Sequence, residues 1–164
     1  MRPLRDALGQ FATGVAVVTT VTPAGERAGV TVNSFTSVSL DPPLVLWCLS
    51  RRAPSAPLFL AAGRFAVNVL REDQDHLSRR FATPAPDKFA GVATRPGPGG
   101  LPVLAGTLAC FACRTVTVHE GGDHVIVVGE VEHFHRSQGE PLVFHAGGYR
   151  AVSAAGRAAE RIGA

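Results

Sequence analysis

The chain has 164 residues, of which 46% are hydrophobic and 18% charged, a balance typical of one folded domain and not of a disordered segment. The net charge is only +3 and the arginines are scattered singly or in pairs, so no basic stripe with interleaved aromatic residues marks a nucleic-acid surface. The polar start has no apolar core of a signal peptide, and no apolar run approaches the roughly 20 residues of a membrane span. Three cysteines, an odd number, argue against a disulfide framework. We expect a cytoplasmic protein that binds neither membrane nor nucleic acid.

The first part of the chain predicts a helix and a β-hairpin. Residues 3–11 carry a proline at a first helical position and leucine or phenylalanine at helical spacing, so a short helix ended by Gly14 is expected. Residues 15–22 are β-branched and predict a strand. Turn residues occupy 23–27, and a returning strand is expected from Ala28 onward.

The middle of the chain alternates short strands and helices. Residues 41–43 spell DPP and interrupt strand pairing, because prolines cannot donate a backbone hydrogen bond. Residues 44–49 and 65–70 predict strands. A helix is expected over 55–63, which has a proline near its start and a glycine at its end. Asp73 is expected to cap a further helix with apolar residues on one face.

The rest of the chain predicts a long loop and then more strands. Residues 83–106 are rich in proline and glycine, as a long loop would be. Two long strands are expected over 107–119 and 124–134, joined by the turn GGD, and a last short strand over 141–145. Because the strands are mostly consecutive and antiparallel while the helices are short and peripheral, the pattern predicts a mainly β fold, a closed barrel with helices over its ends.

Two patterns resemble redox or metal motifs. Cys110 and Cys113 spell CxxC, but a redox pair needs a helix N-terminus and a zinc site needs a second ligand pair. On a strand these positions point to opposite faces, which favours two small buried residues. His133 and His135 would share one face and Glu130 the other, so surface histidines are the simpler interpretation and a cupin-type metal barrel is the alternative.

Residues 31–40, TVNSFTSVSL, place many small hydrogen-bonding side chains between two apolar stretches. Strand-edge amides together with hydroxyl and amide groups can meet the polar atoms on the edge of a heteroaromatic ring such as a flavin. The alternative is a Ser/Thr-rich barrel strand at a solvent edge. No GxGxxG follows a strand and no GxxxxGK[ST] occurs, so a bound nucleotide would use neither a Rossmann nor a P-loop device.

This stretch carries a family resemblance. Residues 29–49, GVTVNSFTSVSLDPPLVLWCL, are similar to the signature segment of the flavin reductase-like, FMN-binding split-barrel family. Its members include the reductase components of two-component flavin monooxygenases of the 4-hydroxyphenylacetate 3-monooxygenase type. Further similar segments follow the family order at residues 11–20, 65–70, 87–92, 122–131 and 141–152. The resemblance defines one domain over 1–152 and leaves a tail over 153–164.

The resemblance implies an antiparallel split β-barrel homodimer, with short peripheral helices, that passes a hydride from NADH or NADPH to FMN or FAD. A partner monooxygenase would receive the diffusible reduced flavin. His124 matches a histidine beside the nicotinamide and Tyr149 an aromatic residue near the flavin. A non-catalytic flavin carrier on the same barrel is the alternative, and no metal is implied. The other flavin-binding positions that the family implies are Thr31, Val32, Asn33, Ser34, Ser37, Val38, Ser39, Ser50, Arg51, Lys88 and Phe89.

One segment departs from the family pattern. Residues 50–57, SRRAPSAP, are richer in arginine and proline than the usual Ser/Thr-rich version, which implies either firmer phosphate binding or room for the larger FAD. Hydride transfer requires the nicotinamide C4 about 3–3.5 Å from the flavin N5, so we expect positioning to dominate catalysis. The lack of an evident acid–base dyad in the sequence agrees with that expectation.

Overall fold

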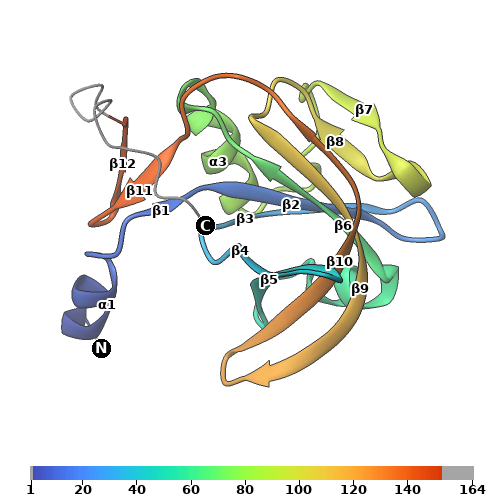
Figure 1. Cartoon of the computed structure of the whole chain (residues 1–164), viewed down its shortest axis with the longest axis horizontal. Coiled ribbons are helices and arrows are strands. Elements are labelled where there is room, and N and C mark those ends of the chain that lie inside the picture. The colour runs from blue at the N-terminus through green and yellow to red at the C-terminus, as the bar shows by residue number, and fades with distance from the viewer. Residues whose placement is uncertain (1, 153–164) are drawn as a thin grey trace.

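The computed structural model describes residues 2–152 as a mainly β molecule with a few short helices (Figure 1). Its main sheet is antiparallel, with seven strands in the order β3-β2-β6-β9-β10-β5-β4. These strands are β2 (Ala16–Val21), β3 (Arg27–Val32), β4 (Thr36–Leu40), β5 (Pro43–Ser50), β6 (Arg64–Val69), β9 (Ala109–Gly121) and β10 (His124–Arg136). The predicted mainly β, antiparallel fold is confirmed, and the predicted tail over 153–164 lies outside the described residues.

The two edge strands of this sheet, β3 and β4, are consecutive in the chain. In a flat seven-stranded sheet they would lie about 29 Å apart, at about 4.8 Å per strand. Residues 33–35 alone link them, and the four Cα-to-Cα steps from one strand to the other span at most about 15 Å. The sheet therefore curls until its edges approach each other, while neither edge pairs with the other in the described sheet. This opening, which we call the seam, makes the barrel a split one.

The barrel interior is packed around Trp47. This side chain is fully buried and meets Phe59 and Phe65 edge to face, at 5.2 and 5.6 Å between ring centroids. Phe59 belongs to α2 (Ala56–Ala62), so that short helix packs into the barrel core. Gly63 ends the helix in the left-handed conformation, at φ 66°, which confirms the predicted helix and its glycine stop.

A second core lies on the outer face of β2. There α3 (Asp75–Ala82) packs Leu77 and Phe81 against buried valines of the sheet, as the expected apolar face required. The predicted cap is wrong: Asp73 lies one turn earlier and forms an ion pair with Arg71. The helix itself begins without a side-chain cap.

The remaining elements are short and cover the barrel or extend from it. Residues 83–106, predicted as a loop, contain a two-stranded ribbon, β7 with β8, that packs over β6 and β9. Buried hydrogen bonds hold it: the Thr19 hydroxyl donates to the Pro102 carbonyl at 2.6 Å, and the Leu104 amide donates to the Asn68 side chain at 2.9 Å. The smaller elements are α1 (Arg2–Leu8), β1 (Thr13–Gly14), η1 (Glu72–Gln74), β7 (Thr94–Pro96), η2 (Pro98–Gly100), β8 (Pro102–Leu104), β11 (Val143–His145) and β12 (Gly148–Arg150).

Three local expectations need correction. The first helix ends at Leu8, and Gly14 instead pairs with Val143 in a small sheet of β1, β11 and β12. Strand β12 was not expected at all. Asp41 and Pro42 do not interrupt pairing but form the turn of a hairpin, because Leu40 pairs directly with Pro43.

Cys110 and Cys113 lie on β9 and face different cores, on opposite sides of the sheet. Burial raises the pKa of the Cys110 thiol to about 11 and that of Cys113 to about 12. Both thiols therefore stay protonated at neutral pH, and their interpretation as buried apolar residues is confirmed. Around His133 and His135, as elsewhere in residues 2–152, no group of three or more His, Cys, Asp or Glu side chains is placed to hold a metal.

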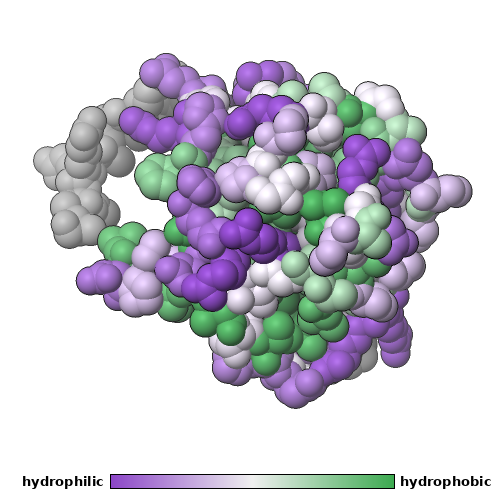
Figure 2. All heavy atoms as spheres, turned by 90° about the vertical axis from the view of Figure 1, so that its right-hand side faces the viewer, coloured by the Kyte–Doolittle hydropathy of each residue, from purple (hydrophilic) through white to green (hydrophobic). Residues whose placement is uncertain are grey.

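The surface carries both polar groups and large apolar side chains. Figure 2 shows one face of the molecule, on which hydrophilic residues predominate and hydrophobic residues gather toward the lower half. Several large apolar side chains are exposed, including Phe11, Leu40 and Phe134. Within the described part of the chain, no helix has the length and apolar character needed to cross a membrane.

Gly29 in β3 provides a test of how closely α3 approaches the sheet. A methyl group at this position would lie 2.5 Å from two ring atoms of Phe81, whose side chain is fully buried and cannot swing away. We expect Gly29→Ala to lower the free energy of unfolding by about 1–3 kcal/mol, measured by urea denaturation. Gly14→Ala, where no atom lies within 4 Å, is the control and should change it by less than about 0.5 kcal/mol. Equal losses would contradict the close approach.

The buried thiols predict a loss of stability in alkali. Their folded pKa values lie above the usual thiol value of 9.0, so the folded state keeps protons that the unfolded state releases. Their contribution is complete below that value and is lost as the pH rises from there through about 11 for Cys110 and about 12 for Cys113. The urea midpoint should therefore fall over this range, and less steeply in the double variant Cys110→Ala/Cys113→Ala. Equal slopes in both proteins would refute the assignment.

Candidate functional site

The segment predicted to hold a flavin forms the seam of the barrel. Thr31 and Val32 end β3, residues 33–35 cross the seam, and Ser37 to Ser39 lie on the edge strand β4. Pairing with β5 shifts between Ser37 and Ser39, so that Val38 is the extra residue of a β-bulge and is half exposed. A bulge on an edge strand leaves backbone groups without a strand partner. The seam therefore presents backbone as well as side-chain hydrogen-bonding groups.

Two side-chain hydrogen bonds hold the seam in place. The Thr31 hydroxyl donates to the Ser78 carbonyl of α3 at 2.6 Å, and the Ser34 hydroxyl accepts from the Cys48 amide of β5 at 2.9 Å. Ser34 keeps its hydroxyl hydrogen for a further bond. Asn33 and Ser37 are exposed. The predicted group thus divides into residues that anchor the seam and residues that face outward from it.

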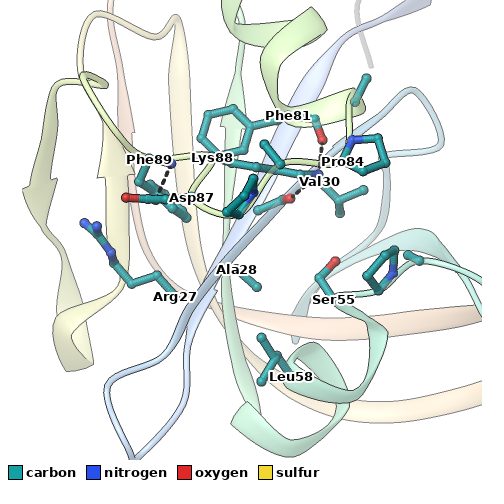
Figure 3. Close-up of a pocket in the computed structure, with 16 residues that line it drawn as sticks. Arg27, Ala28, Val30, Ser55, Leu58, Phe81, Pro84, Asp87, Lys88 and Phe89 are labelled. Atoms are coloured by element: carbon teal, nitrogen blue, oxygen red, sulfur yellow. Dashed lines mark hydrogen bonds between the residues drawn. The ribbon is translucent and has the colours of Figure 1, made fainter.

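A cavity of about 620 Å³ lies next to the seam, between β3, α2 and the loop that follows α3 (Figure 3). Residues 27–30 of β3, residues 53–55 with Leu58, and the region of 81–89 line it. We call it the β3 cavity. Its walls are mostly alanine, valine, proline, leucine and phenylalanine, with few polar groups, and its size suits a small-molecule site. None of residues 31–40 lines it.

Lys88, one of the predicted phosphate contacts, lies in the wall of the β3 cavity. Its Nζ donates to the Phe81 carbonyl at 2.7 Å and to the Gly29 carbonyl at 3.3 Å (Figure 3). Burial lowers the pKa of its ammonium group. Because an ammonium carries three N–H donors, one is left for a ligand. Lys88 therefore joins the loop to β3 and α3 and keeps one donor to spare.

Phe89 is a core residue and not an exposed contact. Its ring is buried and packs edge to face on Phe81, at 5.1 Å between centroids. The guanidinium of Arg27 lies 4.7 Å from the centre of the same ring. Arg27 was missed in the sequence, because it stands at the end of a turn among ordinary turn residues. A cation and an aromatic ring thus share one wall of the β3 cavity (Figure 3).

His124 opens β10 and lies opposite Ser50 of β5. Its Nδ1 is 2.7 Å from an Asp123 carboxylate oxygen, and this hydrogen bond lowers the pKa of the Asp123 carboxyl. When Nδ1 carries the proton that Asp123 accepts, Nε2 is an acceptor that a ligand N–H can meet. Asp123 is a further residue here that the sequence did not single out. We call the group of His124, Asp123 and Ser50 the His124 corner.

Ser50 and Arg51 continue the same corner of the barrel. Arg51 forms an exposed ion pair with Glu120, and its backbone amide donates to the Asp123 carbonyl. The Ser50 carbonyl accepts from the Ala53 amide at 3.1 Å, and Ala53 lines the β3 cavity. One turn therefore connects the His124 corner to the cavity, which brings two parts of the predicted site together.

Tyr149 contacts α3 but does not line the β3 cavity. Its hydroxyl is 2.8 Å from the Ser78 hydroxyl, and the Arg79 guanidinium stacks 4.9 Å from its ring centre. It lines a second cavity of about 510 Å³ together with charged residues of both signs. Ser78 is the link to the seam, because its carbonyl accepts from Thr31. Within one chain the predicted residues thus form a connected set, with Tyr149 at its margin.

Comparison with known proteins places the chain in a family. The flavin reductase like domain matches residues 8–153. The chain is 49% identical over 148 residues to the "FMN reductase (NADH) SmoA" of Agrobacterium fabrum, covering 90% of this chain and 84% of that protein. It is 43% identical over 154 residues to HsaB of Mycobacterium tuberculosis, named as the reductase subunit of a flavin-dependent monooxygenase, with 92% and 82% covered. Another relative, from Rhizobium meliloti, is 47% identical, and the chain spans 55% of its length.

A solved structure gives the same result. The NADH:FAD oxidoreductase SgcE6 of Streptomyces globisporus, solved with NAD and FAD fragments, matches with a TM-score of 0.88 and 40% identity over 93% of each chain. The resemblance carried by residues 29–49 is therefore confirmed at the level of both sequence and fold. The chain belongs to the flavin reductase-like domain family.

Proposed function

We propose that this chain is an NADH-dependent flavin reductase that transfers a hydride from NADH to FMN or FAD. The observation that carries the proposal is the match of residues 8–153, nearly the whole described chain, to the family. SmoA is named for NADH and FMN, SgcE6 for NADH and FAD. HsaB is named as a monooxygenase subunit, so we assign this chain the task of supplying reduced flavin to a separate oxygenase. The cytoplasm, where reduced nicotinamide is available, is its expected location.

The seam has the chemistry that a flavin needs. When bound, flavin supplies the ring that accepts the hydride, and the protein supplies position. Asn33 and Ser37 offer exposed side-chain hydrogen-bonding groups, and the bulge at Val38 offers backbone groups, to the polar edge of such a ring. Small side chains permit close approach. Ser34, held by the Cys48 amide, can donate from a fixed position.

The nicotinamide is expected at the His124 corner. Asp123 holds the imidazole through Nδ1, and Nε2 is then a fixed acceptor for the carboxamide N–H of the donor. This is a positioning role, since hydride transfer needs no proton from the protein. Hydride transfer requires the chain to hold the nicotinamide ring against the flavin ring. This orientation of the two rings lowers the barrier to the reaction.

We also infer a homodimer with the flavin near the subunit interface. Phe11 and Leu40 are 80% and 92% exposed, and Phe134 is 75% exposed, so these large apolar side chains are available for a partner to cover. A second copy is the occupant that the family resemblance implies. Light scattering that gives only the monomer mass while flavin is still bound would overturn this inference.

The reductase activity is tested by mixing the protein with FMN or FAD and NADH and following the near-ultraviolet absorbance of NADH. A steady loss that depends on both flavin and protein is expected. Flavin binding, seen as quenched flavin fluorescence, without NADH oxidation would instead identify a flavin carrier and refute the proposal. NADPH in place of NADH tests the choice of donor.

Lys88→Ala is expected to weaken flavin binding. Loss of its charge-assisted hydrogen bond to a flavin phosphate should cost roughly 1.5–3 kcal/mol, about 10- to 150-fold in affinity, measured by fluorescence quenching. Because Lys88 also ties down its loop, Arg80→Ala is the matched control: Arg80 donates to the Lys88 and Ala90 carbonyls without lining the cavity. Unchanged FMN binding in Lys88→Ala, or an equal loss in Arg80→Ala, would reject a phosphate contact.

His124→Ala is expected to raise the KM for NADH and lower kcat/KM while flavin affinity stays nearly constant, because only the nicotinamide loses a partner. Steady-state kinetics at saturating flavin, with a separate flavin titration, measure both effects. His119→Ala, on the neighbouring strand β9, is the control and should behave as the unmodified protein. Loss of flavin with retained nicotinamide kinetics would assign His124 to the other ligand.

A further inference from the structure

Two consecutive arginines, Arg51 and Arg52, stand where β5 ends and the chain turns away from the His124 corner. The turn begins at Ser50, which lies opposite His124, and the Ala53 amide closes it by donating to the Ser50 carbonyl at 3.1 Å. Turns favour Gly, Pro, Asn, Asp or Ser, so the backbone here does not require two long cations. The two arginine side chains are therefore candidates for a contact outside the turn.

The two arginines differ in what their side chains contact. The Arg51 guanidinium forms an ion pair with Glu120 of β9, and the Arg51 amide donates to the Asp123 carbonyl at 3.0 Å. The Arg52 amide donates to the Ser50 hydroxyl at 3.3 Å, which fixes the backbone of Arg52. Within residues 2–152 the Arg52 side chain forms no ion pair and no hydrogen bond. Among the described residues, its guanidinium thus keeps its N–H donors for a ligand.

The charges around the His124 corner favour a role for the Arg52 cation. Asp123 and the neighbouring Glu120 bring two carboxylates to this end of the barrel, and their charge repels an anionic nucleotide. Arg51 offsets Glu120. The hydrogen bond from His124 lowers the pKa of the Asp123 carboxyl most, and the charge of Arg52 lowers it further. With a neutral imidazole, this group of residues would carry a net negative charge if Arg52 were removed.

A donor whose nicotinamide lies at His124 brings its pyrophosphate toward Arg52. In NADH the ribose that carries the nicotinamide is joined directly to the pyrophosphate, and the adenosine lies beyond it. The pyrophosphate is therefore the anionic group nearest to the nicotinamide. Ser50, two residues before Arg52, is the direct strand partner of His124. A guanidinium can hold two phosphate oxygens through parallel N–H bonds, which a single point charge cannot.

We propose that Arg52 binds the pyrophosphate of NADH and thereby determines the preference of this site for nucleotide donors over dihydronicotinamides without phosphate. Arg51 stays paired with Glu120, so one residue of the turn makes the contact. The inference rests on the proposed function for the placement of the nicotinamide at His124. The flavin phosphate and the 2′-phosphate of NADPH are competing sources of the same chemistry.

The kinetic test compares three donors at saturating flavin: NADH, reduced nicotinamide mononucleotide with one phosphate, and 1-benzyl-1,4-dihydronicotinamide with none. We expect Arg52→Ala to raise the KM for NADH about fivefold, the upper range for an exposed ion pair. The KM for the mononucleotide should rise less, and that for the benzyl donor should not change. Added salt should raise the KM for NADH in the unmodified protein and much less in Arg52→Ala, because salt screens this contact.

Arg95→Ala is the matched control. Arg95 is an exposed arginine of β7 that lines neither the β3 cavity nor the second cavity, so the variant loses the same charge elsewhere on the surface. It should keep the KM for NADH of the unmodified protein. A measurement without turnover is NADH binding in the absence of flavin, followed by NADH fluorescence. Binding should weaken about fivefold in Arg52→Ala and less in Arg52→Lys, which keeps the charge.

The outcomes separate this inference from the proposed function. Equal increases in KM for NADH and the benzyl donor, or the same increase in Arg95→Ala, would overturn the phosphate contact and leave the reductase standing. An effect on NADPH alone would assign Arg52 to the 2′-phosphate, and weaker flavin binding with an unchanged KM for NADH would assign it to the flavin. Either result overturns the inference. If the unmodified protein oxidises no donor, the reductase is refuted, whereas NADH binding that weakens in Arg52→Ala and not in Arg95→Ala still supports the phosphate contact.

Discussion

The three residues that cross from β3 to β4 constrain the whole molecule. A sheet of seven strands whose edges must meet within about 15 Å has to close on itself. Closure creates an interior, which Trp47 and its aromatic neighbours fill, and an exterior, on which α3 and the β7–β8 ribbon pack. Residues 33–35, which cross between the two edge strands, lie in no strand. The gap between the edges, the polar seam, therefore stays open. The architecture and the polar seam that we propose for flavin binding thus follow from one short connection.

Much of the fold could be predicted because its signals are local. The β-branched run before the first hairpin, the glycine after α2 and the alternation of β9 and β10 each appear within a few residues. The β7–β8 ribbon and β12 left no comparable signal. The ribbon depends on Thr19 bonding Pro102, 83 residues away, and on Asn68 bonding Leu104, 36 residues away. No short window of sequence contains both partners of these hydrogen bonds, so the ribbon could not be predicted from local signals.

The candidate site shows the same division. The hydroxyl-rich seam could be singled out from composition, and the family resemblance added His124 and Lys88. What the sequence did not reveal is how each group is already engaged: Ser34 with the Cys48 amide, Lys88 with two carbonyls, His124 with Asp123. Arg27 could be identified only from the structure, in which its guanidinium lies over the ring of Phe89. The type of a residue predicts which hydrogen bonds its side chain can make. Tertiary packing decides how many of those bonds remain free for a ligand.

Lys88 carries a consequence for the lifetime of the complex. A cation already satisfied by two backbone carbonyls needs no ligand to justify its burial, and in the proposed complex it would give an arriving phosphate a single further bond. When the phosphate leaves the proposed complex, Lys88 keeps both carbonyl partners, so its surroundings do not have to rearrange. Differences in affinity arise mainly in dissociation rates, so a phosphate held by a single bond to Lys88 would leave faster than a phosphate held by several such bonds. Rapid turnover of the bound flavin is what a protein needs if its product must diffuse to another enzyme before oxygen consumes it.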